Sequence, residues 1–596
     1  MVSDPTSGFG GHRNARSKTV EEVADGFVAP PQYWEIAQPG NTVLAGPRGS
    51  GKTTLLKMLQ GPALERWDDP LNDRARGLVT YSGILIPADR SWAGQVNSYG
   101  DQIEDPDLRK DFGKACFTLH VLRALSACAQ QRVSEPPDGA RPHDRVSLDP
   151  GGQERIVRDV WRTWALTEPV GSFAGLQEAL STLLANFGNL ARRSRRHPQA
   201  VDELSAHPAL DLDLVDITVP FIERFNNAVG QEEHVWAFLI DEVEFLPQGV
   251  HVEFRRTMRG RDPRIIQKIS LAPYTLVSEE LRGTALDGWE GHDVEVVDLT
   301  FPEKEDGYEF SRDLIEKEIE ERGFTATELL GGPGFFEMPP GRDAYENGSR
   351  NATAIKELAE KDESFSAWLA KHKIDPQNPA AVEGDDRAQT LRKAMPIILL
   401  RNEYLHLVRG RLGPRTRKSP RTYVGELTTY AICENNPRRL QTFASRLLSR
   451  ASGDSISDAD RFNVLTQVVD EYKLHLRALE VDEGAPDDLL PSQLVETIGK
   501  HFQDGVLGEK FDPEPALSFE VMTKAIEGTV LRQILSQLIH YGAVVLITPS
   551  RFRLAHTFAP KYTLPVRKGR GHSLKTILPD RLPDEEQMIV GEETSE

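Results

Sequence analysis

The sequence of 596 residues contains few cysteines and no long hydrophobic run, and each shortage excludes a class of protein. Its three cysteines, Cys116, Cys128 and Cys433, form no CxxC pair and lie near no pair of histidines, so we expect neither a disulfide framework nor a metal site made by them. No apolar run reaches the ~18 residues of a membrane-spanning helix, and the first residues, MVSDPTSGFGGHRNARSKTVEE, lack the apolar core of a signal peptide. These absences predict a cytoplasmic protein that does not enter a membrane.

Basic residues are also in the minority. The 71 Lys and Arg residues are outnumbered by 91 Asp and Glu, which gives a formal net charge of −20. This charge argues against a protein that covers nucleic acid with its whole surface, so any such contact must be local. The composition, 39% hydrophobic and 27% charged, is otherwise that of an ordinary globular protein. The chain is too long for a single hydrophobic core and should form several domains.

The most specific motif present is a P-loop within NTVLAGPRGSGKTTLLKML, residues 41–59. An apolar strand over 42–45 precedes the pattern Gly46-x-x-x-x-Gly51-Lys52-Thr53, and a leucine-rich helix follows it. This strand–loop–helix context is the one that phosphate binding requires. Glycines allow successive backbone N–H groups to surround a phosphate at the N-terminus of the helix.

The roles of the P-loop residues follow from this chemistry. Lys52 is expected to reach the β- and γ-phosphates of ATP, and the Thr53 hydroxyl is expected to bind Mg²⁺. The predicted cofactors are therefore ATP and Mg²⁺, with ADP as the product that the site also holds. The predicted nucleotide-binding residues are Gly46, Pro47, Arg48, Gly49, Ser50, Gly51, Lys52, Thr53 and Thr54.

A second segment, EEHVWAFLIDEVEFLP, supports a hydrolytic site. Its apolar strand, 235–240, delivers Asp241 and Glu242 at its C-terminal end, as a Walker B element does. Asp241 would hold Mg²⁺ through water, and Glu242 would orient or deprotonate the attacking water. Glu244 could join these carboxylates, although a solvated loop position is the simpler interpretation for it.

The segment AICENNPRRLQTF, residues 431–443, begins a helix with two cations. Asn436 suits the N-cap and Pro437 the first helical position. The positive end of the helix dipole disfavours Arg438 and Arg439, so an anion is expected nearby. The alternative is that both are surface arginines paired with Glu434.

The order of P-loop, FLIDE, a later strand and NNPRRLQTFASRLL resembles that of AAA+ ATPases. By this resemblance Arg438 is the sensor 2 arginine, which reaches the γ-phosphate from a helical lid, and Asn435 replaces the usual glycine. More narrowly, most of residues 26–570 resemble the origin-recognition and replication-initiator branch, in particular its bacterial relatives. The implied fold is an α/β P-loop NTPase (AAA+) with a helical lid and a C-terminal winged helix.

The resemblance also implies several further site residues. The segment FVAPPQYWEIAQPGN, residues 27–41, resembles the lining of an adenine pocket, and Ser270 on the strand RIIQKISLAPY falls at sensor 1, where initiators commonly have asparagine. The strand HDVEVVDLTF fits a fifth parallel strand. Arg282 is the candidate arginine finger for a neighbouring subunit, and its competitors are Arg255, Arg256, Arg259, Arg261 and Arg264.

The predicted domains are as follows. Residues 1–25 are expected to be disordered, 26–305 to form the ATPase domain with an added helical segment at about 150–220, and 306–450 to form the lid with sensor 2. A winged-helix domain over 451–575 precedes an acidic disordered tail, 576–596. The cluster ARRSRRH, residues 191–197, is expected to cap a helix C-terminus or to contact phosphates or a partner.

The winged-helix prediction depends on TVLRQILSQLIHYG, residues 529–542, and on a hairpin around 548–550. Leu531, Ile534, Leu535, Leu538 and Ile539 recur at helical spacing, and Gly542 should close the helix. From Arg551 to Lys575 there are seven Lys and Arg residues and no acid. The predicted outer face of the helix is formed by Arg532, Gln533, Ser536, Gln537 and His540.

Two functions remain open at this point. The first is an ATP-hydrolysing AAA+ switch or remodeller that engages duplex DNA or a protein partner through the winged helix, with a role in bacterial genome defence or mobile-element biology implied by resemblance. The second is a nucleotide-gated assembly scaffold or signalling ATPase whose winged helix binds protein. Both predict a homo-oligomer or a partner protein.

Overall fold

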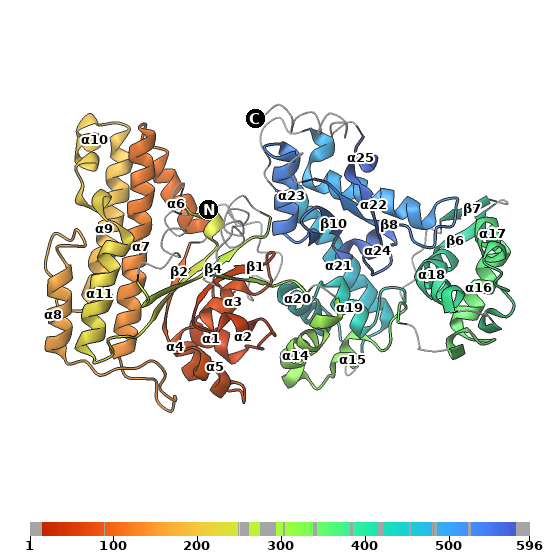
Figure 1. Cartoon of the computed structure of the whole chain (residues 1–596), viewed down its shortest axis with the longest axis horizontal. Coiled ribbons are helices and arrows are strands. Elements are labelled where there is room, and N and C mark those ends of the chain that lie inside the picture. Colours follow the sequence, from red (N-terminus) through yellow and green to blue (C-terminus); the bar gives the residue numbers. More distant parts are fainter. Residues whose placement is uncertain are drawn as a thin grey trace. The chain divides into compact units, whose positions relative to one another are not determined.

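The chain forms two compact units in the computed structural model (Figure 1). One unit contains residues 12–46 and 50–299. The other unit contains residues 47–49 and 300–596. No helix among the described residues is long and apolar enough to cross a membrane. The structure describes residues 15–88, 90–247, 250, 262–274, 294–301, 304–337, 342–381, 385–408, 411–414, 421–451, 455–479, 481, 486–522 and 526–579.

The first unit is built on a five-stranded parallel sheet of order β2-β3-β4-β1-β5. The predicted strands before the P-loop and before Asp241 are both present. The predicted fifth strand is also parallel, and it pairs with β1. Because all strands are parallel, their C-terminal ends lie along one edge, where the loops that follow can meet. The strands are β1 (Asn41–Ala45), β2 (Ser82–Pro87), β3 (Trp236–Asp241), β4 (Ile265–Leu271) and β5 (Val294–Asp298).

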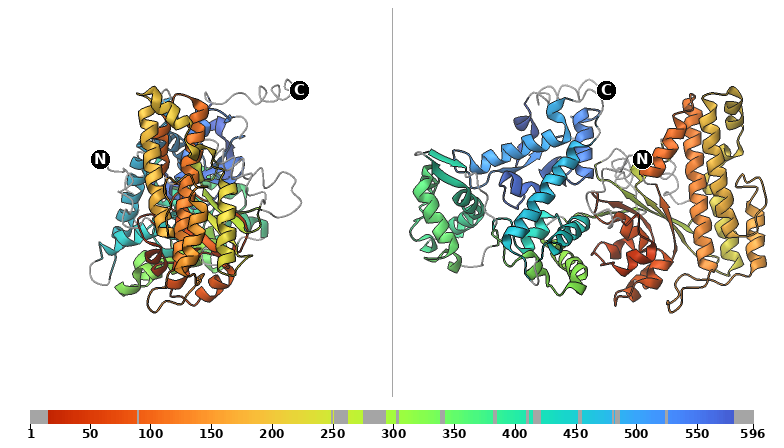
Figure 2. Two further views of the ribbon diagram at one scale, coloured as in Figure 1. Left: turned by 90° about the vertical axis from the view of Figure 1, so that its left-hand side faces the viewer. Right: turned by 180° about the vertical axis from the view of Figure 1, so that it is seen from behind.

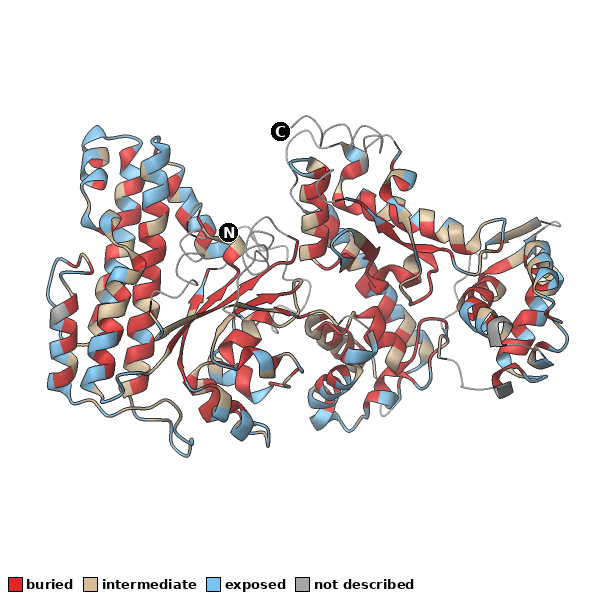
Figure 3. Ribbon diagram, viewed as in Figure 1, coloured by how far each residue is buried: buried red, intermediate tan, exposed pale blue. Residues whose placement is uncertain are grey.

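Alternate residues of the strands enter two separate hydrophobic cores. Phe238 and Ile240 of β3 face the first core, whereas Ala237 and Leu239 face the second core on the opposite side of the sheet. Burial is concentrated along the sheet and on the helix faces turned toward it (Figure 3). The helices of the second core are α1 (Val20–Asp25), α2 (Tyr33–Ile36), α3 (Lys52–Lys57), α4 (Gly61–Arg66) and α5 (Asn72–Leu78).

The other face is covered by the long helices α7, α9 and α11, which run side by side (Figure 2). The predicted helical segment ends later than the expected residue 220, because the apolar spacing continues through Phe221, Ile222 and Phe225, and Pro220 lies inside α11. The helices on this face are α6 (Arg90–Gly100), α7 (Pro106–Val133), α8 (Pro150–Val160), α9 (Phe173–Ser194), α10 (Pro198–Ser205) and α11 (Leu214–Ala228), with the short η3 (Pro208–Asp211).

The segment predicted to line an adenine pocket places its aromatic residues mainly in the second core. Tyr33 is fully buried, donates its hydroxyl hydrogen to the carbonyl oxygen of Met58 at 3.0 Å and packs edge-on against Phe27. Lys268 of β4, also fully buried, donates to the carbonyl oxygens of Gln38 at 2.8 Å and Gly40 at 3.1 Å. Burial lowers the pKa of Lys268 to about 7. These contacts tie the segment before β1 to the sheet.

The second unit begins with four helices over the range predicted for the lid. They are α14 (Tyr308–Ile319), α15 (Ala326–Leu330), α19 (Glu426–Ile432) and α20 (Pro437–Leu448), and α14 packs on α20. A separate group lies between α15 and α19 in the chain: α16 (Arg350–Lys361), α17 (Glu363–Lys371), α18 (Asp385–Tyr404) and the hairpin β6 (Leu405–Val408) and β7 (Arg411–Pro414). Short 3-10 turns in these regions are η5 (Lys304–Gly307), η6 (Glu320–Arg322), η7 (Arg342–Tyr345) and η8 (Pro379–Ala381).

A buried arginine joins that inserted group to the C-terminal region. Arg401 of α18 is fully buried and donates to Asp362 at 2.6 Å. Its remaining N–H groups donate to the carbonyl oxygens of Val506 at 3.0 Å and Gly508 at 2.8 Å. Because every side of this guanidinium meets an acceptor, its burial is compensated.

The C-terminal region has the winged-helix elements that the sequence predicts. Gly542, with φ +74°, ends α23, and β9 and β10 form the hairpin around 548–551. The sheet order is β11-β8-β10-β9, with β11 parallel to β8. The elements are α21 (Asp458–Arg477), η9 (Asp487–Leu489), α22 (Pro491–Leu507), β8 (Ala516–Glu520), α23 (Val530–His540), β9 (Val544–Thr548), β10 (Arg551–Leu554), η11 (His556–Phe558), α24 (Ala559–Tyr562), β11 (Arg570–Ser573) and α25 (Leu574–Ile577).

Candidate nucleotide-binding site

The P-loop connects β1 to α3 with a backbone shaped to hold an anion. Gly49 and Gly51 have φ values of +87° and +97°, a left-handed region that glycine adopts without strain. The amides of Gly49, Ser50 and Gly51 donate no hydrogen bond within the described residues, and the buried Ser50 hydroxyl has no partner there either. Consecutive amides and a hydroxyl of this kind are suited to phosphate oxygens.

Lys52 begins α3 and is only 7% exposed. Its ammonium group donates to the carbonyl oxygen of Gly46 at 2.5 Å, which closes the loop on itself. Burial lowers the pKa of Lys52, and the nearby carboxylates of Glu244, Glu242 and Asp241 oppose this effect. A buried cation in a loop whose Gly49, Ser50 and Gly51 amides are unbonded suits a polyphosphate.

The Asp241 carboxylate is held between two hydroxyl groups at the C-terminal end of β3. Thr53 of the P-loop helix donates to one oxygen at 2.6 Å, and Ser270 of β4 donates to the other at 2.5 Å. Both Asp241 and Ser270 are almost completely buried. The structure therefore brings together the predicted Mg²⁺ ligands, Thr53 and Asp241, and places the residue proposed for sensor 1 against them.

Glu242 follows Asp241 in a left-handed backbone conformation, φ 61° and ψ 53°, which is uncommon for a residue other than glycine. Its amide donates to the Ser270 hydroxyl oxygen at 2.9 Å, so Ser270 contacts both members of the carboxylate pair. The residue is 8% exposed, and its carboxylate forms an ion pair with Arg16. Unusual backbone conformations of this kind concentrate at functional sites.

Glu244 is a correction to the sequence interpretation. It lies in η4 (Val243–Phe245) and accepts a hydrogen bond from the amide of Ala272 at 3.1 Å, instead of standing in solvent. Burial, with the neighbouring charges of Glu242 and Asp241 adding to it, raises the pKa of Glu244 to about 7. The 3-10 turn after β3 folds this side chain back toward the end of β4, which residue spacing alone does not reveal.

The residues present fit a nucleoside triphosphate with Mg²⁺. Unbonded P-loop amides, the Ser50 hydroxyl and Lys52 would hold phosphates, while Thr53 and Asp241 supply the oxygen ligands that Mg²⁺ prefers. Within the described residues no group of three or more His, Cys, Asp or Glu could hold a metal ion. At P-loop sites Mg²⁺ is bound jointly by the protein and the phosphates, and Thr53 and Asp241 would supply the protein's share.

The predicted sensor 2 helix is α20, and its two arginines differ in environment. Arg438 is a partly buried residue of the first turn. Arg439 is 9% exposed and donates to the Thr557 hydroxyl at 3.0 Å and to the carbonyl oxygen of Gly542 at 2.8 Å. The interpretation that both arginines wait for an anion is therefore wrong for Arg439, which fastens α20 to the C-terminal region of the same unit.

Two residues just before α20, Glu434 and Asn435, bear on two of the sequence predictions. Glu434 pairs with Arg553 at 2.6 Å, so the alternative that it pairs with the lid arginines is wrong. Although burial alone would raise it, the charges of Arg553 and His556 lower the pKa of Glu434 to about 2. Asn435 has φ +50°, a conformation that glycine or asparagine favours, which accounts for asparagine in the place of the motif's glycine.

The arginine-finger candidates lie mostly outside the described residues. These are Arg282 and its competitors Arg255, Arg256, Arg259 and Arg261. The remaining competitor, Arg264, pairs with Asp262 at 2.8 Å just before β4. The acidic tail, from residue 580 onward, also lies outside the described residues.

The basic surface predicted for the winged helix is largely used inside the fold. Arg532 of α23 is 7% exposed instead of lying on the outer face. Arg553, also 7% exposed, is paired with Glu434, and Arg551 donates to the carbonyl oxygen of Gly569 at 2.7 Å. These cations cannot serve as free phosphate contacts without breaking internal bonds.

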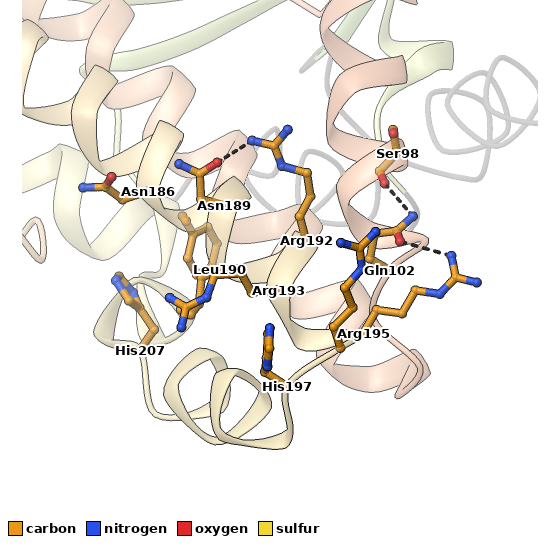
Figure 4. Close-up of a pocket in the computed structure, with 12 residues that line it drawn as sticks. Ser98, Gln102, Asn186, Asn189, Leu190, Arg192, Arg193, Arg195, His197 and His207 are labelled. Carbon is orange, nitrogen blue, oxygen red and sulfur yellow. Dashed lines mark hydrogen bonds between the residues drawn. The ribbon is translucent and has the colours of Figure 1, made fainter.

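The ARRSRRH cluster lies at the C-terminal end of α9 beside an open pocket of about 1360 Å³ (Figure 4). Arg192 pairs with Asn189, and Arg195 donates to Gln102 at 3.3 Å. None of its four arginines forms an ion pair within the described residues. The chain around Gln102 is acidic, DQIEDPD, which offsets part of this positive charge. Helix capping and an anion contact both stay predictions for this cluster.

A parallel sheet with a P-loop after its first strand and an acidic pair after its third defines a P-loop nucleotide-binding protein. The profile of the ORC-CDC6-like family matches residues 9–574, so the chain belongs to this family of AAA+ proteins. The family implies nucleotide binding. No curated protein and no solved structure matches the chain.

Ser270→Ala should remove the hydroxyl that contacts Asp241 and the Glu242 amide. We expect the ATPase kcat to fall by about ten- to a hundredfold while the dissociation constant for ATP changes by less than about threefold, because positioning is lost but the phosphate contacts remain. Steady-state kinetics and nucleotide titration would measure both. Ser126→Ala, which removes a fully buried hydroxyl bonded to Leu122 within α7, is the matched control and should change neither.

Proposed function

We propose that this protein is an ATP-hydrolysing AAA+ switch or remodeller. The observation that carries the proposal is the position of Asp241 between Thr53 and Ser270, with Glu242 beside it. A site that only bound nucleotide would need the P-loop but no second carboxylate at the edge of the sheet. The Asp–Glu pair is the part of the site that fits hydrolysis.

Each residue has a distinct part in this proposal. Bound Mg²⁺ would neutralise charge on the β- and γ-phosphates. Lys52 and the unbonded P-loop amides of Gly49, Ser50 and Gly51 bind and orient the phosphates, and Thr53 and Asp241 hold the metal ion. Glu242 orients the attacking water and accepts its proton. Arg438 is proposed as the sensor that responds to the γ-phosphate.

Glu242→Gln should retain ATP but hydrolyse it at least a hundredfold more slowly, by an order-of-magnitude expectation for loss of a positioned base. Lys52→Ala should instead lose nucleotide binding, because it removes the cation placed on the phosphates. Phosphate release and fluorescent-nucleotide titration distinguish the two variants. Wild-type turnover in the Glu242→Gln protein would show that the catalytic assignment is wrong.

Arg438→Ala should weaken ATP binding or hydrolysis more than ADP binding, since ADP lacks the γ-phosphate that the arginine would contact. Arg439→Ala serves as the contrast: its loss leaves buried acceptors unpaired and should lower the free energy of unfolding by roughly 2–4 kcal/mol. Nucleotide titrations together with urea unfolding of both variants test this division. Equal loss of ATP and ADP affinity in Arg438→Ala would contradict the sensor role.

The partner is proposed to bind through the C-terminal region. Duplex DNA and a protein are the two candidates, and the internal use of Arg532, Arg551 and Arg553 favours the protein-binding alternative. In that alternative the chain is a nucleotide-gated assembly scaffold or signalling ATPase that forms a homo-oligomer or recruits a partner protein. A role in bacterial genome defence or mobile-element biology is proposed for either function.

Gel filtration of the Glu242→Gln protein with ATP discriminates these functions. The scaffold predicts a larger assembly in ATP whether or not duplex DNA is added, with Lys52→Ala as the monomeric control. The DNA-engaging switch predicts co-elution with duplex at ~50 mM salt that is lost steeply as salt rises. No DNA binding at ~50 mM salt, together with ATP-dependent assembly, would exclude the DNA function.

A further inference from the structure

An arginine from the N-terminal segment reaches the proposed catalytic glutamate. Arg16 lies in the stretch Ala15–Lys18 that precedes α1, and its guanidinium forms an ion pair with the Glu242 carboxylate. The side chain of Arg16 is 31% exposed and that of Glu242 is 10% exposed. No sequence motif predicts this contact, because the two residues are far apart in the chain.

The stretch that carries Arg16 is fastened to the P-loop helix. Lys57 of α3 is 7% exposed and donates to the carbonyl oxygens of Ala15 at 2.8 Å and Lys18 at 2.6 Å, one on each side of Arg16. Directly after it, Thr19 caps α1 in a reciprocal capping box with Glu22. The position of Arg16 is therefore set by contacts on both sides.

An ordinary surface ion pair does not account for this arrangement. Arg66 and Asp25, in the same unit, form such a pair, and their side chains are 58% and 49% exposed. Exposed pairs of that kind contribute little. The partner of Arg16 is instead a nearly buried carboxylate next to Asp241, on a backbone in the left-handed region. A charge-assisted contact in such a place restrains the carboxylate.

We propose that Arg16 is a positioning residue that latches Glu242 and restrains ATP hydrolysis until the stretch Ala15–Lys18 moves away. This inference rests on the proposed role of Glu242. A carboxylate whose oxygen accepts from a guanidinium has lost that acceptor for the attacking water. The helix α1 is held separately by its buried residues Val23 and Ala24, so the proposed movement concerns only the stretch before it.

Arg16→Ala should raise kcat by about fivefold, equivalent to about 1 kcal/mol, with KM unchanged, because the change frees the base without touching the phosphate contacts. Arg16→Lys, which keeps the charge with a single donor group, should give a smaller rise. Lys18→Ala is the matched control: it removes a cation from the same stretch and should leave kcat unchanged. In the Glu242→Gln background Arg16→Ala should have no effect.

A readout independent of activity is trypsin cleavage after Arg16, which requires the arginine side chain to leave Glu242. Mass spectrometry should find slow cleavage at Arg16 relative to Lys18 in the wild-type protein, and cleavage at Arg16 several-fold faster in Glu242→Gln. The proposal is wrong if Arg16→Ala leaves kcat unchanged or lowers it. It is also wrong if the rate of cleavage at Arg16 is the same in the wild-type and Glu242→Gln proteins. If the wild-type protein hydrolyses no ATP, the proposed function fails, and the cleavage result alone decides whether Arg16 is latched.

Discussion

The hydrogen-bonded position of the Asp241 carboxylate is the constraint on which the candidate site depends. Thr53 approaches it from the P-loop helix and Ser270 from the neighbouring strand, so two elements converge on the two oxygen atoms of a carboxylate carried by a third. The same serine accepts from the Glu242 amide and so couples the backbone of the second carboxylate to the position of the first. A shift of β3 relative to β4 would disturb both carboxylates together.

The two hydrophobic cores hold that edge of the sheet in place. Since alternate residues of β3 are buried on opposite faces, the strand is fixed from both sides. A buried arginine also links the helices to the sheet. Arg132, near the C-terminal end of α7, is fully buried and pairs with Asp144 at 3.0 Å. Its guanidinium lies over the ring of Trp236 at the start of β3. The large helical layer therefore packs on the sheet that carries the site.

Two arginines show that the tertiary structure, and not the residue type, decides whether a cation is buried or solvated. Arg439 and Arg553 have few local sequence features that separate them from solvated cations, yet both are almost buried and fully engaged. Arg439 ties α20 to the residues after α23, and Arg553 ties the winged-helix hairpin to the turn before α20. The proposed sensor helix and the C-terminal region are thus linked within their unit by buried charges, whose removal would leave unpaired partners.

The sequence by itself determined the family, the parallel sheet, the P-loop and the Asp241–Glu242 pair, because each of these is specified by neighbouring residues. Glycine spacing defines a phosphate loop, and an apolar run followed by acids defines a buried strand with its carboxylates. Only the tertiary structure decided the position of Glu244, the burial of Arg532 and the pairing of Arg16 with Glu242. Those outcomes depend on which segments pack together in space, and a single sequence carries no local signal for contacts between residues that are not neighbours in the chain.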